Sequence, residues 1–458
     1  PGELARHALA AGEWTRAVEL SLAAGEDALV AFAAREALTH FQAGLRVSDE
    51  HRAGNHHQRF RLTLGCARAL VAQGRGADAG AVLATLPEGA GREEFDRLAW
   101  ICRASWVAWR PSAAIAPARR ALEVARDLHD DALVGEAHTL VANPSLTLGD
   151  IDLGLEHIAE ARRIFERLGR EPPALLWMRV AAVEHHRGRE HEALATLDRL
   201  RAAALAEHDE SLLVMERWLR AMALGGLGRY GDAFAALGDV TRIGRGEEAF
   251  ARARVPNTRG WLLFDLGLVA EAVDANEEAL EVIRASEVGP EPEVQVLLNL
   301  AENQLAFGRP DVASRYFDEA EPLAADGEVA RYRLLNRLEI VRGRLALEAG
   351  RLEDALAAAE TARQLASRYA APRNSVRADL LSGEALVRLG RDPEGIAQFR
   401  AAGRAATRCG FAALAEQAHR RAGRLTGSAY HLRQADRWWA RIVASVDPGG
   451  LTPQRRGD

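Results

Sequence analysis

Gly228-Arg229-Tyr230-Gly231-Asp232-Ala233 lies between two stretches whose apolar residues recur at helical spacing, and this arrangement returns along the chain. A period between about 20 and 50 residues is typical of stacked supersecondary units, because one helix pair cannot bury its own apolar face. The intervals between the repeated turn glycines are 39, 40, 39, 41, 42 and 40 residues. The glycines are Gly149, Gly188, Gly228, Gly267, Gly308, Gly350 and Gly390.

Counting from each glycine reveals columns of small residues. Five positions after it stand Ala193, Ala233, Ala272, Ala313 and Ala355, and seven positions before it stand Ala142, Ala181, Ala221, Gly260 and Ala301. Two facing columns of small residues allow paired helices to approach closely. The chain is rich in strong helix formers and has few β-branched or aromatic runs. We predict an all-α fold, a right-handed α-solenoid of about 11 to 12 helix-turn-helix repeats, each of about 40 residues.

The repeats divide the 458 residues into four predicted regions. Short repeats are expected over 1–54 and regular repeats over 55–410. Capping helices are expected over 411–446, and a flexible tail or linker over 447–458. Three turns depart from the glycine rule: we place Arg110 in the glycine position before Pro111, Phe32 in a shortened hairpin, and Gly423 near the C-terminal end.

Composition excludes several functions. All 59 basic residues are arginine, so the chain has neither a phosphate-binding P-loop lysine nor a Schiff-base lysine. Three dispersed cysteines form no metal motif or disulfide framework. The net charge of −6 argues against direct nucleic-acid binding. Without a membrane-length apolar run or a leader pattern, we expect a cytoplasmic protein.

The columns resemble the tetratricopeptide repeat, in which a small residue, a glycine turn, an aliphatic or aromatic residue and an alanine follow in order. The longer unit and the opening Ala10-Ala11-Gly12-Glu13-Trp14 resemble the helical sensor region of MalT-like, large LuxR-type transcriptional regulators. That resemblance implies an upstream nucleotide-binding switch and a downstream helix-turn-helix. The tail Gly450-Leu451-Thr452-Pro453-Gln454 resembles the start of such a DNA-binding module, and the start at Pro1 suggests an excised fragment. A regulator with its DNA-binding part at the other end would carry the same repeats.

The tetratricopeptide resemblance implies that the first helix of each pair lines the concave surface, with positions 10, 6, 3 and 2 before the glycine pointing inward. All three methionines of the chain fall in two adjacent repeats, beside two of the nine tryptophans. Methionine adapts to irregular shapes and tryptophan offers a large rigid contact area, which suits a binding groove. Packing between helix layers is the alternative role. The predicted groove residues are Met178, His185, His186, Met215, Trp218, Met222, Asn257, Trp261 and Phe264.

Other charged clusters offer weaker signals. His185, His186 and His191 lack the spacing of a zinc site, so we predict no metal and regard solvated turn residues as the alternative to a groove role. The arginines Arg217, Arg220, Arg254 and Arg259 could bind an anion, or pair with Glu216, Glu247 or Glu248. We find no catalytic motif and predict neither an enzyme nor a cofactor.

Two functions follow as hypotheses. The first is a sensor region of a bacterial transcriptional regulator that binds a protein, a peptide or a small-molecule effector in its concave groove. The second is a free-standing scaffold for protein-protein interaction. An enzyme built on a repeat fold is the remaining alternative. The sequence leaves the oligomeric state open.

Overall fold

The computed structural model describes residues 1–243, 249–285, 290–325, 329, 331–446 and 450–455. Within these ranges the chain forms 23 α-helices and one short 3-10 helix, and no strand. The predicted all-α repeat fold is confirmed. None of the described helices is long and apolar enough to cross a membrane.

The first half comprises α1 (Gly2–Ala10), α2 (Trp14–Val30), α3 (Ala34–His51), α4 (His56–Ala72), α5 (Gly76–Leu83), α6 (Gly91–Val107), the 3-10 helix η1 (Pro111–Ala114), α7 (Ile115–Asp127), α8 (Asp131–Leu148), α9 (Ile151–Leu168), α10 (Ala174–His186) and α11 (Glu190–Ala206). The second half comprises α12 (Glu210–Gly226), α13 (Tyr230–Ile243), α14 (Ala249–Asp265), α15 (Val269–Arg284), α16 (Pro290–Ala306), α17 (Pro310–Ala325), α18 (Arg331–Glu348), α19 (Leu352–Arg368), α20 (Pro372–Arg388), α21 (Asp392–Cys409), α22 (Ala412–Thr426) and α23 (Ala429–Ala444).

Each of the turns between the paired helices places one residue in the left-handed backbone region. Gly228 has a φ of 75°, and all seven of the repeated turn glycines have positive φ values. The helix after the turn begins two residues later, as Tyr230 does after Gly228. Glycine is favoured there because it has no Cβ to clash with the preceding carbonyl.

The irregular turns correct two details of the predicted register. Trp109, with a φ of 57°, occupies the turn position before Pro111, so the assignment to Arg110 is wrong by one residue. Gly423 lies inside α22, and Gly427 forms the turn that follows it. Phe32, with a φ of 57°, is the turn residue between α2 and α3 as predicted.

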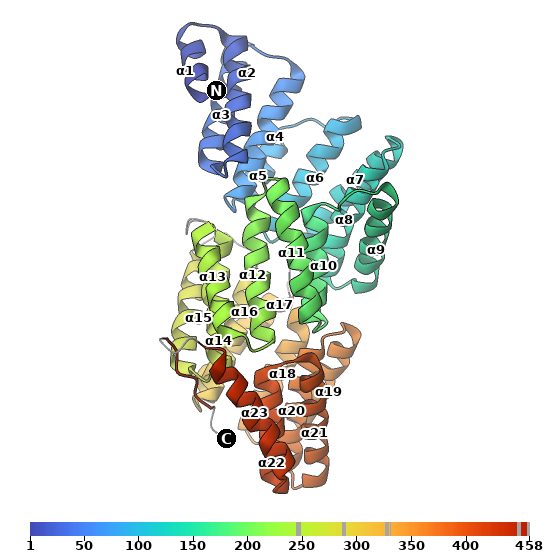
Figure 1. Cartoon of the computed structure of the whole chain (residues 1–458), viewed down its shortest axis with the longest axis vertical. Helices are drawn as coiled ribbons and strands as arrows, with labels where there is room; N and C mark the ends of the chain where they lie inside the picture. The colour runs from blue at the N-terminus through green and yellow to red at the C-terminus, as the bar shows by residue number, and fades with distance from the viewer. Residues whose placement is uncertain (244–248, 286–289, 326–328, 330, 447–449, 456–458) are drawn as a thin grey trace.

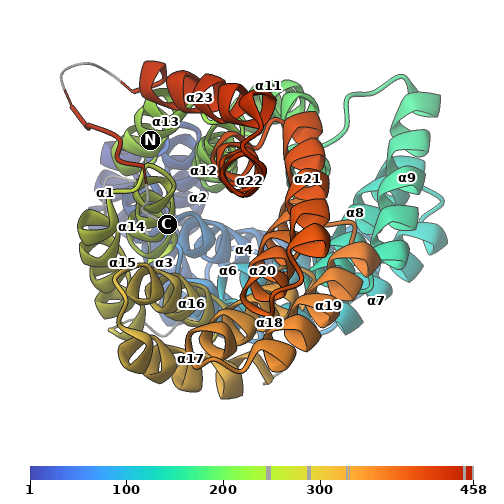
Figure 2. The same ribbon diagram turned by 90° about the horizontal axis from the view of Figure 1, so that it is seen from below.

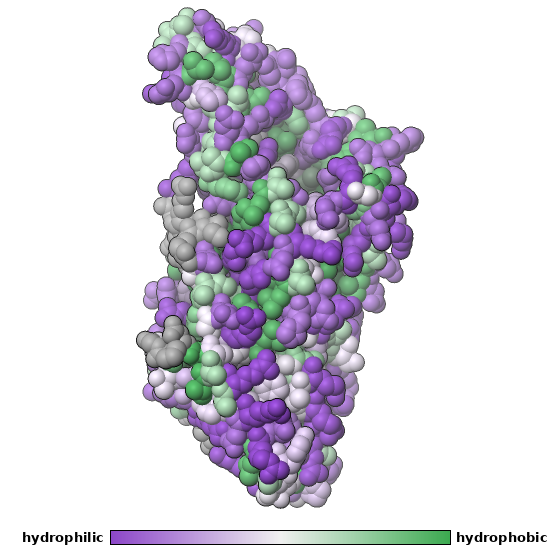
Figure 3. All heavy atoms as spheres, viewed as in Figure 1, coloured by the Kyte–Doolittle hydropathy of each residue, from purple (hydrophilic) through white to green (hydrophobic). Residues whose placement is uncertain are grey.

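The small columns lie where paired helices meet. Ala193, Ala233, Ala272, Ala313 and Ala355 are fully buried, as are Ala142, Ala181, Ala221 and Ala301. Each even-numbered helix from α2 to α22 packs against the odd-numbered helix that follows it, and each from α2 to α20 also packs against the next even-numbered helix. Figure 2, viewed along the long axis, shows the helices arranged around that axis. The face of the molecule that Figure 3 shows is mostly hydrophilic.

Successive turns of the superhelix touch one another. Helix α18 contacts α8, and α12 contacts α4. The backbone N–H of Gly231 donates to the carbonyl of Ser445 at 2.9 Å. A Cβ on Gly188 would lie 2.8 Å from the Phe411 ring, and one on Gly228 would lie 2.4 Å from the Cβ of Ala412. These two glycines therefore also give the next turn room to approach.

The two ends of the chain are held differently. The first helices form a separate apolar cluster from Ala8 to Ala104 and project as an N-terminal arm at the top of Figure 1. At the other end, the backbone N–H of Gln454 donates to the carbonyl of Leu266 at 2.8 Å. Arg455 forms an ion pair with Asp436 at 2.7 Å. The described tail residues thus lie against the solenoid, and the four region boundaries stay a prediction.

Candidate functional site

A partly open cavity of about 300 Å³ lies on the concave side of the superhelix. Its wall comes mainly from the first helices of seven successive pairs, α10, α12, α14, α16, α18, α20 and α22, with the ends of α6 and α8. The large apolar and aromatic lining residues are Trp106, Trp109, Met178, Met215, Trp218, Leu219, Met222, Trp261, Phe264, Leu334, Ile340, Leu380, Leu381 and Leu414. The charged lining residues are Arg179, Glu190, Arg254, Asp265, Glu291, Glu302, Arg333, Arg337, Arg344, Arg373, Arg377, Glu384 and Arg421.

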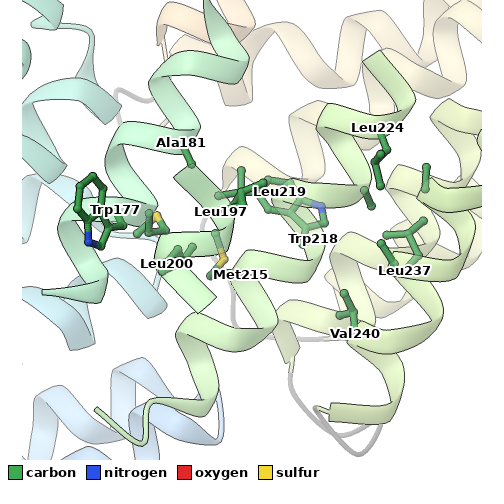
Figure 4. Close-up of a cluster of buried hydrophobic side chains, with 14 of the residues drawn as sticks. Trp177, Ala181, Leu197, Leu200, Met215, Trp218, Leu219, Leu224, Leu237 and Val240 are labelled. Atoms are coloured by element: carbon green, nitrogen blue, oxygen red, sulfur yellow. The ribbon is translucent and has the colours of Figure 1, made fainter. Parts of the chain in front are cut away.

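All nine residues predicted for the groove lie in the wall of this cavity. Five of them are buried, namely Met178, Met215, Trp218, Asn257 and Phe264. The other four, His185, His186, Met222 and Trp261, are partly exposed. The methionines and Trp218 also belong to or pack against the main apolar core, as the close-up in Figure 4 shows for Met215 and Trp218. Packing and cavity lining are thus shared by the same side chains, and the use of these residues by a ligand stays a proposal.

Trp218 contacts a polar and a charged side chain in the wall. Its indole N–H donates to the Thr258 hydroxyl at 2.9 Å. The Arg254 guanidinium stands 4.9 Å from the centre of the Trp218 ring and 4.2 Å from that of the Trp109 ring. Such cation-π contacts are worth most where water is excluded, and Arg254 is 2% exposed. In this wall, Arg254 therefore lies between two tryptophan rings.

Arg254 also connects this wall to α16. It donates to the Gln295 side chain at 2.8 Å and forms an ion pair with Glu291 at 3.4 Å. Glu291 additionally pairs with Arg333 of α18. The carboxylate is 2% exposed, so two guanidinium groups share one buried negative charge.

The histidines in the wall are not solvated turn residues. The Nε2 of His186 donates to the carbonyl of Tyr369, 183 residues away, at 2.9 Å. Burial lowers the pKa of His186 to about 3, and the positive charges of nearby Arg333 and Arg187 act in the same direction. His185 Nδ1 lies 2.7 Å from a carboxylate oxygen of Glu190. The alternative of a solvated turn is therefore wrong for these two residues, while His191 is exposed.

We expect the neutral state of His186 to make stability depend on pH. The unfolded chain binds a proton at this site below about pH 6.5, whereas the folded chain does so only near pH 3. Stability present at neutral pH is therefore lost as the pH falls between these values, by up to about 1.4 kcal/mol per pH unit. Urea unfolding at pH 7.5 and pH 5 should show a smaller loss in His186→Gln, which keeps a donor but does not titrate. The exposed His7→Gln should behave like the unaltered protein, and equal losses in all three would contradict the assignment.

The predicted arginine pairs are found in part. Arg217 and Arg220 pair with Glu216 at 3.4 Å and 2.5 Å. Arg254 pairs with Glu291 instead, and Arg259 is exposed. The predicted partners Glu247 and Glu248 lie outside the described residues.

Of the arginines that line the cavity, sequence reasoning singled out Arg254 and missed those contributed by the later repeats. Arg254, Arg337 and Arg377 stand 13 positions before their turn glycines, and Arg333 and Arg373 stand 17 positions before theirs. These columns lie one and two helical turns before the inward position at 10 and continue the same face of the helix. Extending the count by two turns would have found them.

The described residues contain no group of three or more histidine, cysteine or acidic side chains that could hold a metal ion. Burial raises the pKa of both Cys66 and Cys102 to about 12, which makes these thiols inert.

Comparison with solved structures bears on the fold. The apo form of the quorum sensor NprR from B. thuringiensis superposes with a TM-score of 0.50 and 12% identity, over 77% of this chain and 99% of that one. The chain is a tetratricopeptide-like α-solenoid. A Rap protein complexed with Competence and Sporulation Factor has a TM-score of 0.42 and 15% identity, over 86% of this solenoid and 99% of that chain. Yeast Tom70 has a TM-score of 0.39 and 13% identity, over 93% and 97%.

No protein-family model matches the solenoid, and no curated protein matches it in sequence. The structural likeness, at identities below 16%, therefore concerns the fold alone.

Proposed function

We propose that this solenoid is a ligand-binding sensor region and that it binds a peptide in the cavity described above. The observation that supports this is the cavity itself, which is surrounded by the first helices of seven successive repeats. Its volume of about 300 Å³ lies at the lower end of the range found for ligand pockets. Aromatic and methionine side chains would supply contact area, and a few polar groups would orient the ligand.

Signalling would follow from the way the wall is assembled. His186 bonds to Tyr369, and Asp265 pairs with Arg373 at 2.9 Å across 108 residues. Both contacts join repeats that are distant in sequence. A ligand that touches both sides would favour the arrangement in which they are docked, and it can shift the equilibrium only by its differential affinity for that state.

Carboxamides in the wall favour a peptide over a purely apolar effector. Asn257, Asn299, Asn374 and Gln295 line the cavity. A carboxamide has two donor hydrogens and two acceptor lone pairs. Some of these already bond within the wall, as the Asn299 amide does to Asn257 at 2.6 Å, and the others match the alternating N–H and C=O groups of an extended peptide. NprR has also been solved in complex with its cognate peptide NprX, with a TM-score of 0.42 to this chain, which makes peptides the first class to test.

The regulatory context rests on the resemblance to MalT-like regulators. We propose that the solenoid belongs to a signal-transducing transcriptional regulator in which a nucleotide-binding switch precedes it and a helix-turn-helix follows it. The complete reading frame tests this directly: an upstream P-loop would support the proposal, and a native start and stop at the ends of this sequence would reject it.

A free-standing scaffold is the alternative. Recognition of whole partner helices calls for an open groove, whereas the cavity here is walled by contacts between superhelical turns. The small volume, about 300 Å³, favours a short ligand and thus the sensor.

Native mass spectrometry of protein purified from its source, followed by thermal denaturation with peptide pools, tests the proposal. We expect a retained or added peptide to raise the melting temperature. Trp261→Ala, in the cavity wall, should remove that rise, whereas Trp14→Ala, equally half-buried but on the N-terminal arm, should retain it. A rise that survives Trp261→Ala would place binding elsewhere.

A further inference from the structure

The charges of the cavity wall differ in sign from those of the whole chain. Eight arginines and five carboxylates line the cavity, an excess of three positive charges. The chain as a whole carries a net charge of −6. A recessed site with an excess of one sign of charge attracts ligands of the other sign, because low-dielectric walls focus the field.

The positive charge is concentrated on one side. Helices α10, α12 and α14 contribute the methionines together with Trp218 and Trp261. Helices α18, α20 and α22 contribute six of the eight lining arginines, namely Arg333, Arg337, Arg344, Arg373, Arg377 and Arg421. The cavity thus has an apolar side and a cationic side.

The carboxylates on the cationic side are shared. Glu302 of α16 pairs with both Arg337, at 3.6 Å, and Arg377. Glu384 pairs with Arg421 at 3.1 Å but also with Arg388, which lies outside the cavity wall. Two guanidinium groups that share one carboxylate retain a net positive charge.

Arg344 has no counterion within the described part of the chain. No hydrogen bond or ion pair involves its side chain, although it lines the cavity. Its charge acts on Arg421, whose pKa is lowered by burial and by the proximity of Arg344. The pKa of Arg337 is likewise lowered to about 10, by burial and by the neighbouring charges of Arg333 and Arg373. A cluster of arginines that repel one another in a buried site is stabilised when an anion binds among them.

We propose that the ligand of this cavity is an acidic amphipathic peptide. Its apolar side chains contact the apolar side of the cavity, and its carboxylates bind Arg344, Arg337 and Arg421. The inference rests on the proposed peptide-binding function and names the class of peptide. Planar guanidinium groups bind carboxylates with two parallel hydrogen bonds. Arg344 can form such a pair without breaking an existing one, which makes it the first anchor for the acidic end.

Three peptide pools test the inference. Each peptide has three apolar positions, drawn from leucine, methionine and phenylalanine, followed by Glu-Glu, Gln-Gln or Arg-Arg, with both ends blocked. Four of the nine tryptophans, Trp106, Trp109, Trp218 and Trp261, line the cavity, so their fluorescence reports binding. We expect the Glu-Glu pool to bind about tenfold more tightly than the Gln-Gln pool, and the Arg-Arg pool to bind most weakly.

Variants identify the residues responsible. Arg344→Gln leaves no carboxylate without its partner, and Arg337→Gln leaves Glu302 paired with Arg377, so both variants should fold. Each should reduce the preference for Glu-Glu over Gln-Gln to about two- or threefold. Arg46→Gln, on the exposed face of α3, should keep the full preference.

The outcomes separate the two proposals. Equal binding of the Glu-Glu and Gln-Gln pools overturns the acidic-ligand inference but leaves peptide binding intact. An undiminished preference in Arg344→Gln and Arg337→Gln overturns the assigned anchors. If inorganic phosphate raises the melting temperature as much as the Glu-Glu pool does, and no pool is preferred, the cavity is a site for free anions. That result also overturns the inference. If no pool binds, the peptide-binding function fails and this inference fails with it.

Discussion

Replacing Glu291 by alanine is expected to lower the free energy of unfolding by about 3 to 5 kcal/mol. The carboxylate is 2% exposed and pairs with Arg254 and Arg333, and it also accepts a hydrogen bond from Gln295 at 3.0 Å. Its removal leaves Arg254, which is just as buried, without its buried counterion. Urea unfolding followed by circular dichroism measures the loss.

Three comparisons test whether the cost arises from the uncompensated charges. Glu291→Gln, which keeps an acceptor but not the charge, should lose less than the alanine variant. Replacing the whole set, with Arg254→Met, Glu291→Leu and Arg333→Met together, should recover much of the stability, because burying ions is itself costly. Glu3→Ala, whose side chain is 85% exposed, should change stability by less than about 0.5 kcal/mol. A loss in Glu3→Ala as large as in Glu291→Ala would contradict the explanation.

Trp218→Ala is expected to cost about 3 to 5 kcal/mol of unfolding free energy, as truncations of buried tryptophan do. The ring is 5% exposed, and the variant would also remove the hydrogen bond to Thr258 and one aromatic face against Arg254. Trp218→Phe keeps a ring and should lose far less. A change below 1 kcal/mol in the alanine variant would mean that the side chain is not part of the packing.

Trp261 provides the contrast. It lies in the same wall but is partly exposed, with the Arg373 guanidinium 4.8 Å from its ring centre. Its truncation should affect ligand binding more than stability. The sequence predicts both tryptophans as equivalent groove residues. In the structure, Trp218 is buried in the packing between helices and only borders the cavity, whereas Trp261 is the more exposed of the two.

The fold could be predicted from the sequence because its rules are local. A left-handed turn such as that at Gly228 favours glycine, and a close helix crossing such as that at Ala233 favours a small residue. Both requirements repeat at a fixed period. Where a bulky residue such as Trp109 occupies the left-handed turn, the signal disappears, and the predicted register there was wrong by one residue.

The cavity could be predicted only on one side. Counting from the glycines identified Met178, Trp218 and Trp261, since all lie on the inward face of the first helix. The sequence does not reveal that Tyr369 would bond to His186, because contacts between superhelical turns depend on the sum of small rotations over about five repeats. The cationic side could have been found by extending the count, but the assembly of both sides into one cavity could not.

The contacts between superhelical turns also bear on cooperativity. In an ordinary solenoid each repeat touches only its neighbours, so stability is a sum of nearest-neighbour terms and the array can unravel from either end. Here the Gly231–Ser445 hydrogen bond ties a central repeat to the end of the last helix, so opening the C-terminal end exposes surface in the middle. We therefore expect the body of the molecule to behave as one cooperative folding unit. The N-terminal arm has its own apolar cluster and is therefore the part best able to open by itself. Such opening would break the Arg103–Asp209 ion pair, which joins the arm to a later repeat.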